Sequence, residues 1–411
     1  MDEFSLKDSE LRAYTRPMLT TTLSQLRCPC RKTARSRCLS PLKLQIKTQV
    51  PLVSQPDVFE IRMGQLECTQ CRAIFPILEG VAVIVEDVHS YLLNHVKGIS
   101  TRVKVEDLPK AYRNDFKEAQ SEIEQEHIEE DLEAERVNSL YLMNHFLRVN
   151  PQKSGLPSHW WKPASGPGSP VLDSLVRDYW DRGPFAQIEN WLSQRTPRPP
   201  ALNTIELGCG VGGLSRQLKP YLSAYLGVDG SFASIATARH LALGVPDGSP
   251  GKKSPGFKIP GDLLEGPVSR AITIPAETSP SGNVDFIVGD LEALPLLEGR
   301  ADLCIALNTI DMLDQPQELP KTQYRLLKQE GIAIQSGPYI WHEKVAQQLR
   351  QALPKNMKDS AMAVKSLYEK AGFTIRENQD HVPWLFFKHL RQIELYSVHV
   401  FMGQKTIQKI P

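Results

Sequence analysis

The sequence predicts an α/β protein in which a parallel sheet covered by helices follows a small β-rich domain. Three observations predict this arrangement. Strand-like apolar runs alternate with helix-like runs from Leu202 onward, which is the pattern of a parallel sheet with helices on both faces. A glycine-rich turn directly follows the first of these runs. Five of the seven cysteines lie within residues 23–90, beside short β-like runs.

Length and composition fit a soluble protein of two or three domains. The 411 residues exceed one ordinary domain, and the net charge of +1 gives no general reason to expect nucleic acid or an acidic membrane as partner. No apolar run approaches the roughly 20 residues of a membrane span. The N-terminus is acidic and unlike a secretory signal, and an odd number of cysteines argues against a disulfide framework. We therefore expect a cytoplasmic protein without a membrane partner.

The chain divides into four expected segments: a flexible leader (1–22), a cysteine-bearing β-rich domain (23–90), a helical connector and linker (91–200) and the α/β domain (201–405). The connector ends in a Pro/Gly/Ser tract from Pro151 to Pro170, and the α/β domain contains a surface insertion from Gly244 to Gly282.

The expected elements follow from periodicity and from the residues that begin and end each run. In the β-rich domain the strands are Leu42–Ile46, Val58–Arg62 and Val81–Val85, and the connector has a helix over Glu118–Leu147. In the α/β domain the strands are Leu202–Leu207, Tyr225–Val228, Val284–Val288, Ala301–Leu307, Ile332–Gln335, Phe373–Arg376 and Leu395–Met402, and the helices include Phe232–Leu243 and Ala361–Ala371.

The central motif is the run Ile205-Glu206-Leu207-Gly208-Cys209-Gly210-Val211-Gly212-Gly213. Glycines allow a sharp turn and the close approach of a ligand, and the following helix start offers free N–H groups. Three acidic residues make the motif more specific. Glu206 can engage an ammonium group, Asp229 can accept from ribose hydroxyls at the end of the second strand, and Asp290 can accept from an adenine amino group after the third.

These residues resemble the motifs of class I S-adenosylmethionine (SAM)-dependent methyltransferases, including the third motif Gly289-Asp290-Leu291-Glu292-Ala293-Leu294-Pro295. The resemblance covers about half of the chain. It implies a Rossmann-like seven-stranded sheet and SAM as cofactor. The alternative is a nicotinamide-binding enzyme, which would leave the Asp290 motif unexplained. The cofactor-binding residues implied are Glu206, Gly208, Gly210, Gly212, Asp229, Asp290, Leu291 and Asn308.

The acceptor is expected beyond the fourth and fifth strands, where polar and aromatic residues gather. Methyl transfer requires alignment of a lone pair and removal of a proton. Candidate catalytic residues are Asp311, His342 and Tyr339, with His381 as a further base and Asn308 and Trp341 as positioning groups. Each of these side chains is equally compatible with a supporting or surface role.

A second resemblance covers the C-terminal third of the chain. The run Ser336-Gly337-Pro338-Tyr339-Ile340-Trp341-His342-Glu343, with Val382-Pro383-Trp384-Leu385, His389, Arg391 and His399, resembles the methyltransferase half of ovothiol synthase and, more distantly, carnosine N-methyltransferase. It implies a small, histidine-like acceptor with a nucleophilic nitrogen. The chain departs from the pattern by inserting Gly337 between the serine and the proline.

The cysteines of residues 23–90 have the pattern of a structural zinc site. Cys28-Pro29-Cys30 and Cys68-Thr69-Gln70-Cys71 provide two pairs that can close a tetrahedral Cys₄ site, so the predicted ligands are Cys28, Cys30, Cys68 and Cys71. The first pair is one residue short of the usual Cys-x-x-Cys, and Cys38 is a substitute ligand. The alternative is a metal-free descendant of such a site.

The flanks of the second pair resemble the zinc-ribbon activator shared by tRNA, ribosomal and release-factor methyltransferases. The matching run is Cys68-Thr69-Gln70-Cys71-Arg72-Ala73-Ile74-Phe75-Pro76-Ile77-Leu78-Glu79-Gly80-Val81-Ala82-Val83-Ile84, and the match extends over residues 64–87. It implies a stabilising or substrate-gripping role. With the seven basic residues from Arg27 to Lys47 it keeps RNA or protein open as an alternative acceptor. A non-catalytic SAM-binding scaffold is the third possibility.

Overall fold

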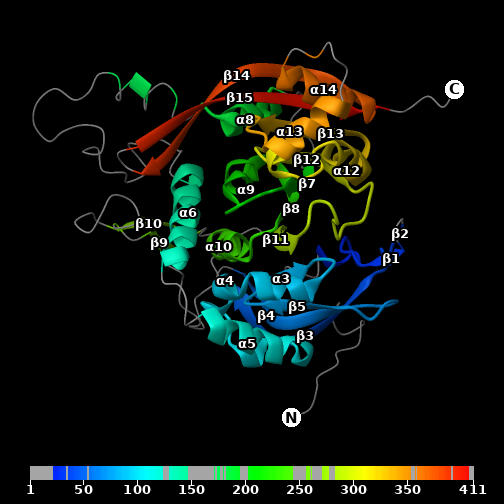
Figure 1. The fold of residues 1–411 in the computed structure, drawn as a ribbon, viewed down its shortest axis with the longest axis vertical. Coiled ribbons are helices and arrows are strands. Elements are labelled where there is room, and N and C mark those ends of the chain that lie inside the picture. Colours follow the sequence, from blue (N-terminus) through cyan, green and yellow to red (C-terminus); the bar gives the residue numbers. More distant parts are fainter. Residues whose placement is uncertain are drawn as a thin grey trace, which may run out of the picture.

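The structure is a computed structural model of the whole chain. It describes residues 22–33, 36–52, 55–123, 129–146, 182–194, 202–243, 256–259, 271–276, 283–352, 359–389 and 392–406, with a few single residues between these ranges. The predicted leader, apart from Thr22, and the tract from Pro151 to Pro170 lie outside the described residues. One large sheet organises the described part (Figure 1).

The N-terminal β-rich region is an antiparallel meander preceded by a short hairpin. The turn between β5 (Ile74–Leu78) and β6 (Val81–Ile84) consists of Glu79 and Gly80, which both have positive φ angles (49° and 84°), the geometry of a two-residue hairpin. The hairpin is formed by β1 (Arg31–Thr33) and β2 (Ser36–Arg37), and the meander by β3 (Leu42–Leu52), β4 (Gln55–Cys68), β5 (Ile74–Leu78) and β6 (Val81–Ile84). The three strands predicted here were placed correctly, but β5 was missed and β3 and β4 are longer than expected.

The connector is helical where it is described. Of the helix expected over Glu118–Leu147, the structure describes the residues before 124 and from 129 to 146, and both parts are helical. The elements are α3 (Val88–Asn94), α4 (Val96–Ser100), η1 (Val105–Asp107), η2 (Lys110–Tyr112), α5 (Arg113–Ile123), α6 (Glu129–Phe146) and α8 (Pro184–Ser193).

The remaining elements build the α/β region. They are β7 (Leu202–Leu207), α9 (Gly213–Gln217), η4 (Lys219–Tyr221), β8 (Leu222–Asp229), α10 (Phe232–Leu243), β9 (Phe257–Ile259), β10 (Ile272–Ile274), β11 (Val284–Gly289), β12 (Ala301–Leu307), η5 (Ile310–Met312), α12 (Glu318–Leu326), β13 (Leu327–Gly337), α13 (Glu343–Ala352), α14 (Ser360–Lys370), β14 (Phe373–His389) and β15 (Gln392–Lys405). The paired strands β9 and β10 are what the structure describes of the predicted insertion.

Seven of these strands form the predicted sheet, in the order β11-β8-β7-β12-β13-β15-β14. The first five are parallel, and β15 runs antiparallel to both β13 and β14. Residues of β11 are buried along the whole strand, which is expected when both faces of a parallel sheet are covered. The α/β prediction is confirmed, and the parallel strands bring their carboxyl ends to one edge.

The N-terminal meander continues this sheet. Strand β6 pairs in parallel with β11, with Ala82 opposite Ile287, so the sheet has eleven strands in the described part (Figure 1). The sequence predicted residues 23–90 and 201–405 as separate domains, whereas the structure unites their strands. The physical reason is that β11 would otherwise present an unpaired edge of N–H and C=O groups.

A buried ionic cluster lies where the two regions meet. Arg239 of α10 donates through Nη2 to both carboxylate oxygens of Glu60 on β4, at 2.7 and 2.8 Å, and through Nη1 to Asp285 of β11. Thr22 donates to the second oxygen of Asp285 at 3.0 Å. The three charged side chains are at most 3% exposed. The meander is therefore joined to the α/β region by charge pairing as well as by strand pairing.

Candidate functional site

The glycine turn connects β7 to α9 and has the backbone that only glycine adopts readily. Gly208, Gly210 and Gly212 have φ angles of 71°, 51° and 76°. A Cβ at Gly208 would lie 2.4 Å from Oγ1 of Thr309, and one at Gly212 would lie 2.7 Å from the ring of Phe286. Among the described residues, the nearest atom to a Cβ at Gly210 would be Cε1 of His145, at 3.9 Å, an ordinary van der Waals contact. The outer glycines thus permit close packing, whereas Gly210 is less crowded by the described residues.

Asp229 ends β8 directly beside this turn. Its Oδ2 accepts from the backbone N–H of Gly210 at 2.8 Å, and its Oδ1 accepts from that of Ser231 at 2.9 Å. Burial raises the pKa of Asp229, although these backbone hydrogen bonds oppose the shift. The carboxylate is therefore held in one orientation beside Gly210.

Glu206 lies on β7, two residues before the first glycine, and is 3% exposed. The hydroxyl of Tyr225 on β8 donates to its carboxylate. Burial raises the pKa of Glu206 to about 8; the hydrogen bond from Tyr225 opposes this shift and the charge of Asp229 adds to it. At neutral pH the ligand-free protein therefore holds Glu206 mostly protonated.

This shift predicts proton release when a cationic ligand binds. An ammonium group beside Glu206 favours its ionised form, so we expect roughly 0.9 proton released per ligand bound at pH 7. Calorimetry in buffers of different ionisation enthalpy measures the number of protons released per ligand bound. The substitution Glu206→Gln should reduce this number to near zero. In the unbound protein the folded-state pKa lies above the ordinary value of 4.5, so the stability linked to Glu206 is lost as pH rises through about 8. Equal proton release by wild type and Glu206→Gln would contradict this account.

Asp290, Leu291 and Asn308 lie at the same carboxyl edge, after β11 and β12. Asp290 is exposed, and its Oδ1 accepts from the backbone N–H of Glu292 at 2.8 Å. Asn308 has a φ angle of 52°, and its Oδ1 accepts from the hydroxyl of Ser336 at 3.0 Å. These three residues follow the carboxyl ends of β11 and β12, which the sheet separates by β7 and β8, and their contact with a cofactor remains a prediction.

Asp311 is the buried acid of the expected acceptor region. It is 4% exposed, and its Oδ2 accepts from the backbone N–H of Ile340 at 2.8 Å, which joins the loop after β12 to the loop after β13. Burial raises the pKa of Asp311, which makes its carboxylate a better proton acceptor. His342, in contrast, is exposed.

Tyr339 belongs to a hydrogen-bonded series that crosses the sheet. Its hydroxyl lies 2.7 Å from Nδ1 of His399 on β15, and Nε2 of His399 lies 2.8 Å from Oδ1 of Asn378 on β14. Burial lowers the pKa of His399 to about 4, so the imidazole is neutral. It therefore donates from Nε2 to Asn378 and accepts from Tyr339. Burial also raises the pKa of Tyr339, so its phenol is suited to hydrogen bonding and not to taking a proton.

The two other predicted residues of this region, Trp341 and His381, have different surroundings. Trp341 stacks on Tyr339, with ring centroids 5.6 Å apart and planes within 7°, and donates from its indole to Ser360 at 3.0 Å. His381 is exposed on β14 and bonds to the hydroxyl of Ser397 at 2.8 Å.

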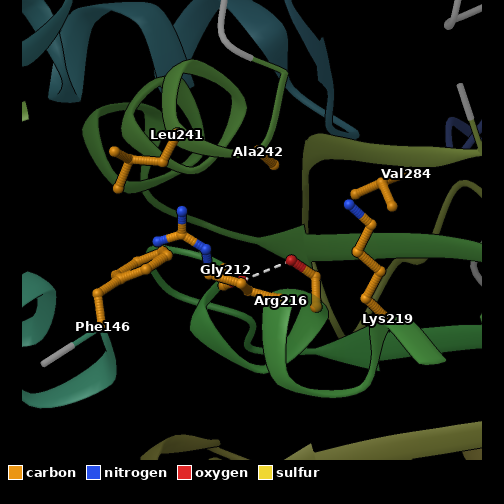
Figure 2. A pocket seen from close by; sticks show the side chains of 8 residues that line it. Phe146, Gly212, Arg216, Lys219, Leu241, Ala242 and Val284 are labelled. Carbon is orange, nitrogen blue, oxygen red and sulfur yellow. Dashed lines mark hydrogen bonds between the residues drawn. The ribbon is translucent and has the colours of Figure 1, made fainter. Parts of the chain in front are cut away.

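A small hollow lies on the other side of the glycine turn. Its lining includes Phe146, Arg216 and Lys219, and it reaches Val284, which begins β11 (Figure 2). The predicted binding residues lie at the opposite, carboxyl ends of the strands. The hollow is therefore distinct from the candidate site, although Gly212 borders both.

Four cysteines form a cluster, and they differ from the predicted four. The Sγ atoms of Cys28, Cys38, Cys68 and Cys71 lie within 4.8 Å of one another. Cys30 lies outside, with its Sγ 4.0 Å from the carbonyl of Glu86. The predicted inclusion of Cys30 is corrected to Cys38.

Local pairing explains the correction. Residues 28–30 pair with residues 38–40, through the N–H of Cys38 to the carbonyl of Cys30 (2.8 Å) and the N–H of Cys28 to the carbonyl of Ser40 (3.0 Å). This pairing brings Cys38 to the site from the neighbouring segment. The second pair forms a turn in which the N–H groups of Gln70 and Cys71 both point at Sγ of Cys68, at 3.4 Å.

The cluster has the dimensions of a tetrahedral thiolate site. Cys28 and Cys71 have their Sγ atoms 3.5 Å apart, and Cys38 and Cys68 have theirs 3.6 Å apart. Zinc–sulfur bonds of about 2.3 Å in a tetrahedron place the sulfurs roughly 3.8 Å apart. Burial opposes ionisation of Cys38, but hydrogen bonds involving Ser40 and Cys68 lower its pKa to about 6, whereas burial raises the pKa of Cys28 and of Cys68. The residues present fit zinc.

Sequence reasoning missed several residues around the site. Tyr225 was read only as the start of a strand, and the adjacency of β7 and β8 makes it the partner of Glu206. Asn378 has no local signal, since its role depends on the pairing of β14 with β15. His145 lies more than sixty residues before the glycine turn that it touches, and no local signal connects the two.

Comparison with known proteins gives a family match over part of the chain. Residues 267–335 match the model of a methyltransferase domain, Methyltransf_11. The match covers 69 of the 411 residues and includes β11, β12 and most of β13 of the sheet described above. Among the residues described, no helix is long and apolar enough to cross a membrane.

Individual similarities are more distant. The biotin biosynthesis bifunctional protein BioHC of Teredinibacter turnerae is 26% identical over 165 residues, covering 36% of this chain and 29% of that protein. The chain thus spans less than a third of the length of this curated relative. A complex of the Haloferax volcanii Trm112 methyltransferase activator with a methyltransferase is similar at 14% identity and a TM-score of 0.37, over 59% of this chain and 97% of that one. The magnesium protoporphyrin IX methyltransferase of Synechocystis PCC 6803 with bound SAH is similar at 15% identity and a TM-score of 0.36, over 66% of this chain and 98% of that one.

Proposed function

We propose that the protein is a SAM-dependent methyltransferase that acts on a small acceptor with a nucleophilic nitrogen. The observation that carries the cofactor assignment is the glycine turn with its two acids. The carboxylate of Asp229 accepts from the N–H of Gly210, and the buried carboxylate of Glu206 lies two residues before the turn, at the carboxyl edge of the parallel strands. Ligands of open α/β sheets bind at this edge. The methyltransferase-domain match over residues 267–335 supports the same assignment.

The residues have distinct binding roles. Glu206 would accept from the ammonium group of the cofactor, and Asp229 from its ribose hydroxyls. Asp290 and Leu291 would contact the adenine, and Asn308 would border the reacting end. When bound, the cofactor supplies an electrophilic methyl group on a sulfonium.

On the acceptor side, Asp311 is the favoured proton acceptor and Tyr339 the favoured positioning group. Asp311 is buried with a raised pKa, and the neutral His399 leaves the oxygen of Tyr339 free to accept from an N–H of the acceptor. The exposed His342 is less favoured as a base. An imidazole-like acceptor would take the methyl group on its unprotonated ring nitrogen and give its one ring N–H proton to Asp311, so Tyr339 would accept from an N–H elsewhere on the acceptor. Incubating the protein with labelled SAM and histidine, carnosine or thiol-histidines tests the imidazole proposal. If the labelled methyl group is transferred to none of these compounds, an imidazole acceptor is ruled out.

The cofactor assignment predicts the effect of Asp229→Ala. Removing the carboxylate should weaken binding of SAM and S-adenosylhomocysteine by tenfold or more, about 1.4 kcal/mol. Calorimetric titration of the purified protein measures it, with the exposed Asp314→Ala as a control that should bind like wild type. A folded wild-type protein that binds neither compound would overturn the cofactor assignment and leave a degenerate Rossmann-like scaffold that does not bind SAM as the better account.

We also propose one structural zinc ion, held by Cys28, Cys38, Cys68 and Cys71. The ion would fix the hairpin β1–β2 to the end of β4 and would take no part in methyl transfer. The basic run gives less support to an RNA acceptor, because Arg31 pairs with Glu86, Lys47 pairs with Asp107 and Arg37 donates to the carbonyl of Glu292. Salt-sensitive binding of tRNA would reverse that preference.

A further inference from the structure

Tyr91 on helix α3 reaches from the connector to the loop that follows β8. Its hydroxyl donates to the backbone carbonyl of Gly230 at 2.8 Å, and Gly230 is the residue directly after Asp229. Burial raises the pKa of Tyr91; a hydrogen bond from the backbone of Phe232 opposes this rise, and the charge of Asp229 adds to it. The phenol therefore stays protonated and lies between the end of β8 and the first residue of α10.

Helix α3 is placed by the strand before it. Strand β6 ends at Ile84, opposite Gly289 of β11, and α3 follows shortly afterwards. The carboxylate of Asp87 caps the start of this helix, because it accepts from the backbone N–H of Ser90 at 3.0 Å. Since β11 lies between β6 and β8 in the sheet, α3 reaches past β11 to bring Tyr91 to the end of β8.

The ring of Tyr91 is held in place from its own helix. His95, one turn later, stacks on it with ring centroids 4.0 Å apart and planes within 19°. Nδ1 of His95 lies 2.8 Å from the backbone carbonyl of Tyr91, which fixes the imidazole in turn. Tyr91 also packs against the buried core that contains Leu92 and Phe232. The hydroxyl is therefore presented to the loop at a fixed position.

The backbone shape of the loop after Asp229 decides how its carboxylate is oriented. Oδ1 of Asp229 accepts from the N–H of Ser231 at 2.9 Å, across Gly230. Apart from its chain neighbours, no atom of the described residues lies within 4 Å of the place of a Cβ on Gly230, so none of them packs against that side of the residue. Glycine also has the widest choice of backbone angles. The hydrogen bond from Tyr91 therefore supplies a restraint that the loop's own sequence lacks.

We infer that Tyr91 is a positioning residue for the ribose of the cofactor, because its hydroxyl holds the loop between β8 and α10 in the shape that orients the carboxylate of Asp229. This inference rests on the proposed function, since it assumes that Asp229 binds the ribose of S-adenosylmethionine. Tyr91 acts through Asp229 and not by touching the ligand. The connector thereby gains a part in cofactor affinity, whereas the sequence marked it only as helical.

A double-mutant cycle tests the inference. Tyr91→Phe keeps the ring and its stacking on His95 but removes the hydroxyl, and it should weaken binding of S-adenosylhomocysteine by about threefold to fivefold in calorimetry. In the Asp229→Ala background the same substitution should have no further effect, because the carboxylate that Tyr91 positions is absent. Tyr112→Phe is the matched control and should bind like wild type, since the Tyr112 hydroxyl donates to the carbonyl of Ile74 at 3.0 Å, away from this loop.

A second ligand gives an independent readout. The 2′,3′-dideoxy analogue of S-adenosylhomocysteine lacks the hydroxyls that Asp229 would bind, so wild type and Tyr91→Phe should bind it with equal affinity. Circular dichroism and melting temperature verify that each variant is folded.

The outcomes separate this inference from the function beneath it. If wild type does not bind S-adenosylhomocysteine, or if Asp229→Ala binds it like wild type, the proposed cofactor site itself fails. If that site stands and Tyr91→Phe binds S-adenosylhomocysteine like wild type, the inference is overturned. An equal loss in the wild-type and Asp229→Ala backgrounds, or an equal loss for both ligands, overturns it too, because Tyr91 would then stabilise the fold and not position Asp229.

Discussion

Replacing Arg239 by leucine is expected to lower the free energy of unfolding by about 3–5 kcal/mol, because it leaves two buried carboxylates without their cation. Glu60 and Asp285 are both nearly inaccessible to solvent, and Arg239 bonds to each of them. Burial raises the pKa of Glu60 and Arg239 opposes that rise. In the variant the folded-state pKa of Glu60 therefore rises further, and the loss of stability should grow as pH increases from 5 to 8. Urea denaturation at the two pH values measures both effects.

Two further variants make the prediction specific to burial. Arg350→Ala removes an exposed ion pair with Glu343 and should cost at most about 1 kcal/mol. Adding Glu60→Gln and Asp285→Asn to Arg239→Leu should recover part of the stability, because the buried charges are then absent. If Arg239→Leu costs no more than Arg350→Ala, the cluster does not join the meander to the α/β region as described.

Replacing Cys38 by serine is expected to remove the proposed zinc ion, whereas Cys30→Ser should leave it in place. Structural zinc contributes directly to folding, with apparent binding free energies of about 10–16 kcal/mol in small zinc domains, so the loss should lower the melting temperature markedly. Elemental analysis of the purified protein should give about one zinc per chain in wild type and in Cys30→Ser, and little in Cys38→Ser. The pair is well matched, because both cysteines lie on the two paired segments around β1 and β2.

The contrary results are equally definite. A wild-type protein that carries no zinc and melts identically with and without a strong chelator would indicate a metal-free cluster. Loss of zinc from Cys30→Ser together with retention in Cys38→Ser would restore the ligand set that the sequence favoured.

The two predictions concern one structural relationship. The cysteine cluster stabilises the start of the meander, and the ionic cluster joins that meander to β11 and α10. Strand β11 leads directly into Asp290, and α10 follows directly from Asp229. We therefore expect the N-terminal region to support the shape of the cofactor site while standing outside it.

The sequence alone determined the elements whose signals are local. The glycine turn required positive φ angles, and Gly208, Gly210 and Gly212 have them. Apolar runs that end near acidic residues predicted β7, β8 and β11. Because parallel strands align their carboxyl ends, the same runs predicted that Glu206, Asp229 and Asp290 lie at one edge of the sheet. These features depend on neighbours within a few residues, which the sequence displays.

Only the tertiary structure decided the contacts between distant segments. Whether Cys30 or Cys38 completes the cluster depends on how residues 28–30 pair with 38–40. The union of the meander with the α/β sheet depends on β6 finding β11, two hundred residues away. The position of His145 beside the glycine turn depends on Asn144 binding β14. Such contacts gain their free energy from burial and hydrogen bonding between segments that carry no local mark of their partner, so the pattern of residues along the chain does not reveal them.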